Sequence, residues 1–230
     1  MLANRKRLVF WCIILVACCA LAMVLVYRVT SMRHARIGEL DMRRLLPKWT
    51  VRLTLGTSEA ELRQNMPRLF DEVAWRDASG EQSYVSDSDH ASGETGQELL
   101  LGMKDGRVTF WHFGGPRDPM AEDVSAYESA LREFTSRVIA ELGKGYELSF
   151  RKPSSEYAGM EHTVLTWRTD TSVAVLAFLA PYRMKNTRGG YTLTVYARTS
   201  ALGRGIGDEL WYYYQDATLE KEARAWLNHR

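Results

Sequence analysis

The first pattern along the 230-residue chain is a run of twenty uncharged, mostly apolar residues from Leu8 to Tyr27. About 20 apolar residues, at ~1.5 Å of rise each, span the ~30 Å hydrocarbon layer of a bilayer as a helix. The run therefore predicts a transmembrane helix that contacts lipid. The side chains expected to anchor it are Leu8, Trp11, Ile14, Leu21, Leu25 and Tyr27.

Two other interpretations of this run involve processing. A basic start followed by an apolar stretch is also typical of a cleaved signal peptide, and residues 20–22 (Ala-Leu-Ala) have the small residues of a cleavage site. Residues 15–18 (Leu-Val-Ala-Cys) resemble a bacterial lipobox, in which Cys18 becomes lipid-modified. The apolar run continues through 23–26, where a processed protein normally turns polar. A retained anchor is therefore preferred.

The charges on either side of the run bear on its orientation. Arg5, Lys6 and Arg7 favour a cytoplasmic N-terminus, whereas five arginines between residues 28 and 44 favour the reverse. Long domains that follow an N-terminal anchor translocate largely regardless of charge. The prediction is a single-pass protein of the bacterial inner membrane with its soluble domain in the periplasm.

Composition narrows the chemistry of that domain. All three cysteines (12, 18 and 19) lie within the apolar run, which excludes disulfides and thiol catalysis outside it. Residues 1–48 carry a net charge of +7 and residues 49–230 carry −5. The basic linker at 28–48 is expected to meet anionic lipid head groups. The mildly acidic domain argues against nucleic acid as a partner.

Beyond residue 48 the pattern alternates between the periods of strands and helices. Residues 49–55 alternate as a half-buried strand does, and Ser58 with Glu61 forms a capping box for a helix that Pro67 ends. The run 211–214 (Trp-Tyr-Tyr-Tyr) is compatible with a strand, a helix or a contact surface. The other expected elements are a weak strand at 73–75, a polar loop at 86–96 without a calcium-binding pattern, a helix at 118–142, strands at 146–151, 162–168, 172–180 and 191–198, a flexible hinge at 203–207, and a helix capped by Asp216.

The clearest local signal is the turn at 105–106, because Asp-Gly supplies both positive-φ positions of a type I′ hairpin turn. A two-residue turn fixes the register of the strands on either side. It pairs Met103 with Val108, Leu101 with Phe110 and Leu99 with His112 on one face, and Gly102 with Thr109, Leu100 with Trp111 and Glu98 with Phe113 on the other.

The second face of this hairpin predicts a binding surface. The more uniformly apolar first face is the natural one for the helix at 118–142 to cover, which leaves the second face exposed. Aromatic residues within a polar rim have the composition of an interface centre. The candidate protein-binding residues are Leu100, Thr109, Trp111 and Phe113. The alternative is that another part of the chain, such as 211–227, buries them.

The predicted fold class is α+β: an N-terminal transmembrane helix, then two helix-on-antiparallel-sheet units and a C-terminal helix. The expected boundaries are an anchor or signal at 1–27, the linker at 28–48 and an extracytoplasmic domain at 49–230. Within the domain, 49–115 and 116–200 are possible repeats, and 208–228 contains the last helix.

A family resemblance accompanies this reading. Residues 56–62 (Gly-Thr-Ser-Glu-Ala-Glu-Leu), followed by the hairpin at 104–108, resemble repeats of the small outer-membrane protein A and β-lactamase-inhibitor-protein group. Those repeats often place Leu-Gly-x-Pro after the helix. Here Pro67 stands in one half and Leu142-Gly143 in the other. The resemblance implies helix-on-sheet repeats and a protein-binding role in the cell envelope, and it transfers no individual functional residue.

Catalytic motifs are not evident. The five histidines show no HxH or HExxH spacing, and no serine lies in a GxSxG motif. No metal or cofactor is predicted. The preferred function is a non-enzymatic protein-binding or assembly module that contacts an unknown envelope protein. The alternative is a membrane-anchored, hydrolase-like enzyme with an unrecognised site, which a polar pocket of clustered Asp, Glu or His would favour.

Overall fold

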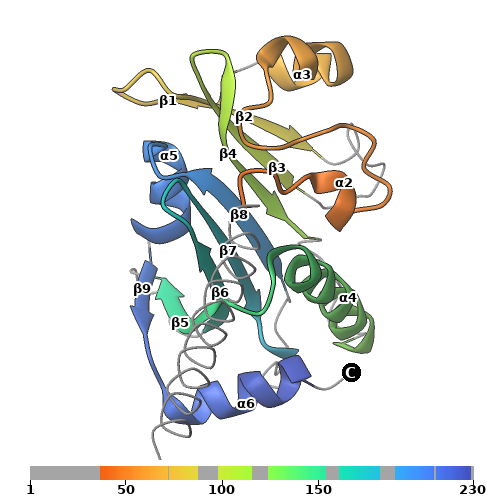
Figure 1. The fold of residues 1–230 in the computed structure, drawn as a ribbon, viewed down its shortest axis with the longest axis vertical. Helices are drawn as coiled ribbons and strands as arrows, with labels where there is room; N and C mark the ends of the chain where they lie inside the picture. The colour runs from red at the N-terminus through yellow and green to blue at the C-terminus, as the bar shows by residue number, and fades with distance from the viewer. Residues whose placement is uncertain are drawn as a thin grey trace, which may run out of the picture.

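The computed structural model describes residues 37–71, 73–87, 98–115, 124–153, 161–181, 190–209 and 211–228. Nine strands of this part form one antiparallel sheet in the order β1-β2-β3-β4-β8-β7-β6-β5-β9 (Figure 1). The strands are β1 (Trp75–Arg76), β2 (Gln82–Asp87), β3 (Glu98–Lys104), β4 (Arg107–Gly114), β5 (Glu147–Pro153), β6 (His162–Arg168), β7 (Ser172–Leu179), β8 (Tyr191–Ala197) and β9 (Trp211–Tyr214). The helical elements are α2 (Met42–Leu45), α3 (Glu59–Asn65), η1 (Pro67–Phe70), α4 (Val124–Leu142), α5 (Ala201–Arg204), η4 (Gly205–Glu209) and α6 (Ala217–Asn228).

The predicted fold class is wrong. It separated two helix-plus-sheet units, whereas β4 of the first half pairs with β8 of the second over Phe110–Gly114, so that both halves share one sheet. Among the described helices, none is long and apolar enough to cross a membrane. The predicted anchor at 8–27, with Leu8, Trp11, Ile14, Leu21, Leu25 and Tyr27, lies outside the described residues.

One face of the sheet, called here the helix face, packs against α4 and α6. Phe134 of α4 lies 5.7 Å from Phe113 and 4.8 Å from Tyr191, measured between ring centroids. Trp226 of α6 lies 5.3 Å from Phe178 in the same way. The apolar stripe of α4 therefore covers its own sheet, as its 3–4 spacing predicts.

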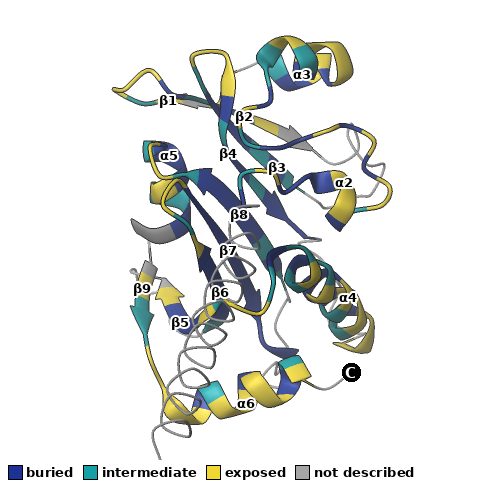
Figure 2. Cartoon of the chain, in the orientation of Figure 1, coloured by how far each residue is buried: buried dark blue, intermediate teal, exposed yellow. Residues whose placement is uncertain are grey.

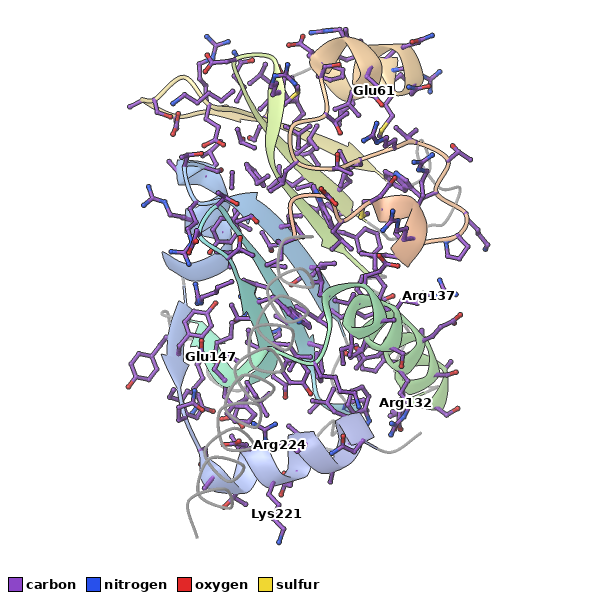
Figure 3. All side chains as sticks on the ribbon, viewed as in Figure 1. Glu61, Arg132, Arg137, Glu147, Lys221 and Arg224 are labelled. Carbon is purple, nitrogen blue, oxygen red and sulfur yellow. The ribbon has the colours of Figure 1, made fainter. Side chains whose placement is uncertain are left out.

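Hydrogen bonds hold α6 against α4. Glu128 accepts one from the indole Nε1 of Trp226 at 3.0 Å and another from Arg132. Arg132 donates to the backbone oxygen of Trp226, and its guanidinium lies 4.6 Å from the centre of the Trp226 ring. The hydrogen bonds from Arg132 and Trp226 hold the pKa of Glu128 below its usual value. Figure 3 shows Arg132 on the side of α4 that lies toward α6.

The opposite face, called here the α5 face, has a smaller core of Phe110, Val164, Val173, Val175, Ala177 and Tyr196, with Leu202 from α5. Strand β7 contributes to both cores, and all eight of its residues are buried (Figure 2). Coverage of both faces explains why this strand is apolar on both sides and does not alternate with polar residues.

The glycine run at 203–207 is not a flexible hinge, so that prediction is wrong. It forms α5 and η4, which pack directly on the strands of the α5 face. A Cβ at Gly203 would lie 2.5 Å from Cβ of Tyr196 and 2.9 Å from Cβ of Phe110. A Cβ at Gly207 would lie 2.8 Å from the Tyr196 ring. The glycines permit close helix-to-strand packing.

The alternation at 49–55 does not produce a strand. Trp49, Val51 and Leu53 are buried, as predicted, but the segment joins no sheet in the described part of the chain. Its backbone instead bonds the preceding loop, through Leu53 O to the Met42 amide and Leu55 N to the carbonyl at 38. The period of two therefore indicated that one side of the segment is buried, and it did not indicate pairing with a neighbouring strand.

The predicted helix caps and the predicted hairpin turn are confirmed. The Ser58 hydroxyl accepts from the Glu61 amide at the start of α3. The turn residues 105 and 106 have φ of 52° and 68°, as a type I′ turn requires. The Asp216 carboxylate accepts from the amides of 218 and 219 at the start of α6. Strand β2 was not predicted.

The close packing of α5 gives a testable expectation. Gly203→Ala should lower the free energy of unfolding by about 1–3 kcal/mol, because the new methyl overlaps the side chains of Tyr196, Ser200 and Phe110, which cannot all move away. Gly205→Ala is the matched control: nothing lies within 4 Å of its Cβ position, and its backbone is helical. Denaturant unfolding measures both. Equal losses in the two variants would contradict the packing explanation.

Candidate functional site

The predicted register of the 98–114 hairpin is wrong beyond its first pair. Met103 pairs with Val108, but the register then shifts, and Gly102 pairs with Phe110 and Leu101 with Trp111. The shift is a β-bulge in which Thr109 is the extra residue. Because side chains alternate with a period of two, a one-residue shift moves every following side chain to the other face.

The shift places the four candidate binding residues in two environments. Trp111 and Phe113 are 0% and 1% exposed and lie on the helix face. Leu100 is half-buried on the α5 face, and Thr109 donates its hydroxyl to Glu81. The structure therefore does not bring the four together as an exposed surface. The covering element at Phe113 is α4 rather than the proposed 211–227 segment.

Alanine substitutions test whether Trp111 lies in the core or on the surface. Trp111→Ala should lower the free energy of unfolding by about 3–5 kcal/mol, the cost of truncating a buried aromatic residue. Tyr212→Ala, at a largely exposed aromatic position, should change it by less than ~0.5 kcal/mol. Thermal and urea unfolding of the two variants measure the difference. Similar midpoints for both would contradict the burial of Trp111.

The exposed apolar side chains point to another part of the sheet. In the described ranges, the large apolar or aromatic residues that are exposed are Val73, Val85, Val124 and Tyr212. Tyr212 stands out at 66% exposure, against 45% for Val85. It lies in β9, which ends the sheet next to β5, and no described strand lies beyond it (Figure 1).

The side chains of β9 alternate between the two faces. Tyr212 and Tyr214 are on the helix face, with ring centroids 6.3 Å apart and an interplanar angle of 19°. Lys152, opposite Tyr212 in β5, places its Nζ 5.1 Å from the centre of the Tyr214 ring. Tyr213 points to the other side and donates its hydroxyl to the Gly207 carbonyl. The exposed ring of Tyr212 therefore lies on a strand whose position is fixed by hydrogen bonds on its inner side.

The two edges of the sheet differ in protection. An exposed edge strand offers unpaired backbone groups, and natural proteins usually shield it by shortness or charge. Strand β1 is two residues long and contains Arg76. Strand β9 has four aromatic residues and no charge. By these criteria, and within the residues that the structure describes, the β9 edge is the less protected of the two.

A polar trough flanks β9 on the α5 face. It has a volume of about 370 Å³, with the buried Ser149 and Thr166 at its floor and Tyr213 and Gln215 on one side. Glu147 and Arg168 form an ion pair of 3.9 Å at its rim. Ser149 and Thr166 belong to β5 and β6, so the trough lies inward of β9 and not beyond its outer edge.

The described residues that most resemble a catalytic group lie elsewhere on the α5 face. A pocket of about 120 Å³ is lined by Glu98, His112 and His162, with small residues such as Gly114 and Ala177 at its base. The His112 Nδ1 lies 2.8 Å from the Thr194 hydroxyl. Across the described residues, no group of three His, Cys, Asp or Glu side chains is arranged to hold a metal ion.

Tyr127 and Asp41, in the described part of the chain, also have shifted pKa values, and the hydrogen bonds that they make are structural. Burial raises the pKa of Tyr127, whose hydroxyl donates to the carbonyls of 179 and 190. Burial raises the pKa of Asp41, but hydrogen bonds from Arg43 and Leu53 outweigh it and hold the pKa below its usual value. Both groups fasten loops to the core. Neither lines the trough or the histidine pocket.

A scan against protein-family models, a search of curated proteins and a search of solved structures each found no match to the chain.

The sequence alone did not show whether residues 211–214 form a strand. The signal that singles out this segment is its composition. Four consecutive aromatic residues without a charge are unusual for an exposed segment, because surfaces favour charged side chains. What the sequence could not supply is the position of β9 at the sheet margin. That position depends on pairing with β5, about sixty residues earlier in the chain.

Proposed function

We propose that this chain is a non-enzymatic protein-binding or assembly module that binds its partner by strand addition at the β9 edge. An extended partner segment would pair with β9 through backbone hydrogen bonds, and its side chains would contact Tyr212 on one face and Tyr213 on the other. The observation that carries the proposal is the uncharged, aromatic edge strand with its 66% exposed tyrosine.

Three physical arguments support this use of β9. Tyrosine is enriched at the centres of protein interfaces, because it offers a large contact area with few rotatable bonds. The strand is fixed on its inner side by β5 and by the Tyr213 hydrogen bond, so little ordering is required on binding. Lys152, which pairs with Glu161 at 3.7 Å, supplies a polar rim beside the rings.

The test is site-specific photo-cross-linking in cells. A photoreactive phenylalanine analogue at position 212 should give a covalent protein adduct, because a partner strand would lie within reach of that side chain. The same analogue at position 85, 45% exposed in β2, should give none. A second variant, His112→Asn with the probe at 212, should retain the adduct. Absence of an adduct at 212, or equal adducts at 212 and 85, would overturn the proposal.

The enzyme alternative is supported by one observation, the Glu98–His112–His162 pocket. Two imidazoles and a carboxylate are suited to acid–base chemistry, yet a volume of about 120 Å³ holds little more than a few water molecules. Loss of the adduct on His112→Asn would move the binding site to this pocket.

The location of the module rests on the N-terminal sequence. We propose a single-pass anchor at 8–27 in the bacterial inner membrane and a periplasmic domain. Alkaline phosphatase folds only outside the cytoplasm, so its fusion after Arg230 should be active, whereas a green fluorescent protein fusion through the same secretion route should be dark. The reverse result would invert the topology, as the arginines at 28–44 allow.

A further inference from the structure

The composition of β9 restricts which partner strand it can accept. A partner must bring side chains that fill the space beside Tyr212 and Tyr214 on the helix face, and it must bring no charge into an uncharged edge. A second copy of β9 satisfies both conditions. From this we infer that the partner is a second copy of this chain, with the two β9 strands paired antiparallel about a twofold axis, an inference that rests on the proposed function.

The geometry of such a pair follows from symmetry. A twofold axis perpendicular to the sheet pairs residues whose side chains lie on the same face. With the axis at Tyr213, Tyr213 faces its own copy, and Tyr212 of each chain faces Tyr214 of the other. Within one chain these two rings are already nearly parallel at 6.3 Å. Pairing therefore brings the two rings of each copy together as a group of four on the helix face.

Charge favours the self-paired arrangement. In an isologous contact each charged residue near the axis meets its own like charge, which destabilises a cross-strand pair. Residues 211–215 contain no charge. Of the two cations on the neighbouring strand, Arg151 lies opposite Tyr213 and is buried, and Lys152 has Glu161 at 3.7 Å. At the other margin, Arg76 occupies half of β1, so the same operation there would bring two arginines together.

The contact is small, and whether it can hold two copies together depends on whether the copies are tethered. Two paired strands of about five residues belong to the weak interfaces that bury less than ~1,200 Å². Tethering two modules raises their effective concentration, which makes a weak contact sufficient. A shared membrane plane, as the sequence of residues 8–27 predicts, provides that tether. The inferred assembly is thus a membrane-bound pair with a sheet continuous across two copies.

The experiment uses the full chain reconstituted in lipid vesicles, with dimerisation measured as energy transfer between copies labelled at the C-terminus over a series of protein-to-lipid ratios. The native chain should form a reversible dimer, and Tyr212→Lys should lower its association constant at least about tenfold, because each copy loses the ring that faces Tyr214 of the other copy and the two new cations become diagonal neighbours on the helix face. Tyr212→Phe and Val85→Lys are the matched controls and should leave the constant unchanged. A monomeric native chain, or a dimer that Tyr212→Lys leaves unaltered, would overturn the inference.

A disulfide test examines the register. In a chain with Cys12, Cys18 and Cys19 changed to Ser, Tyr213→Cys should cross-link two copies on mild oxidation, because residues facing each other across an antiparallel pair have Cα atoms ~4.5–5.5 Å apart. Val85→Cys should not. Failure at 213 with a native-like unfolding midpoint overturns the register.

The photo-cross-link at 212 distinguishes this inference from the proposed function. An adduct of twice the chain mass supports both. An adduct of any other mass retains the function and overturns the second copy as partner, and absence of any adduct overturns both.

Discussion

The arrangement of the described molecule depends on one steric relationship, the packing of the Phe110 ring over Gly102. A Cβ at position 102 would lie 1.9 Å from a carbon of that ring, so only glycine permits the pair. The pair accompanies the bulge that shifts β4 by one residue against β3. Without the shift, Trp111 and Phe113 would leave the helix face, and Phe110 would leave the α5 face. Each core would lose large aromatic side chains.

The bulge also connects β4 to distant parts of the chain. Its extra residue, Thr109, donates to the carboxylate of Glu81, which is 1% exposed. The same carboxylate accepts from the Ser200 hydroxyl at 2.6 Å and the Leu202 amide at 3.1 Å. A buried carboxylate is tolerated only when hydrogen-bonded in this way. Glu81 thereby joins the start of β2, the bulge and the first turn of α5, which holds α5 against Phe110 and Tyr196.

The elements that sequence reasoning identified are those whose causes lie within a few residues. Ser58 and Asp216 cap helices through amides two or three positions away, and the turn at 105–106 needs only its own backbone angles. The bulge was missed because its cause, a glycine beneath a phenylalanine, exists only once two strands are paired. The glycine run at 203–207 was misread for the same reason, since its function is set by Tyr196 on another element.

The candidate site was hidden from sequence reasoning by the same dependence on distant pairing. Trp111 and Phe113 have the composition of an interface, yet composition does not distinguish an interface centre from a core, because both are dense in aromatic residues. The distinction is made by what covers them. Strand β8 and helix α4 complete the surroundings of Phe113, whereas β9 has β5 on one side and no described strand on the other. An aromatic strand at the margin of a sheet retains the capacity for pairing that its central counterparts have already used.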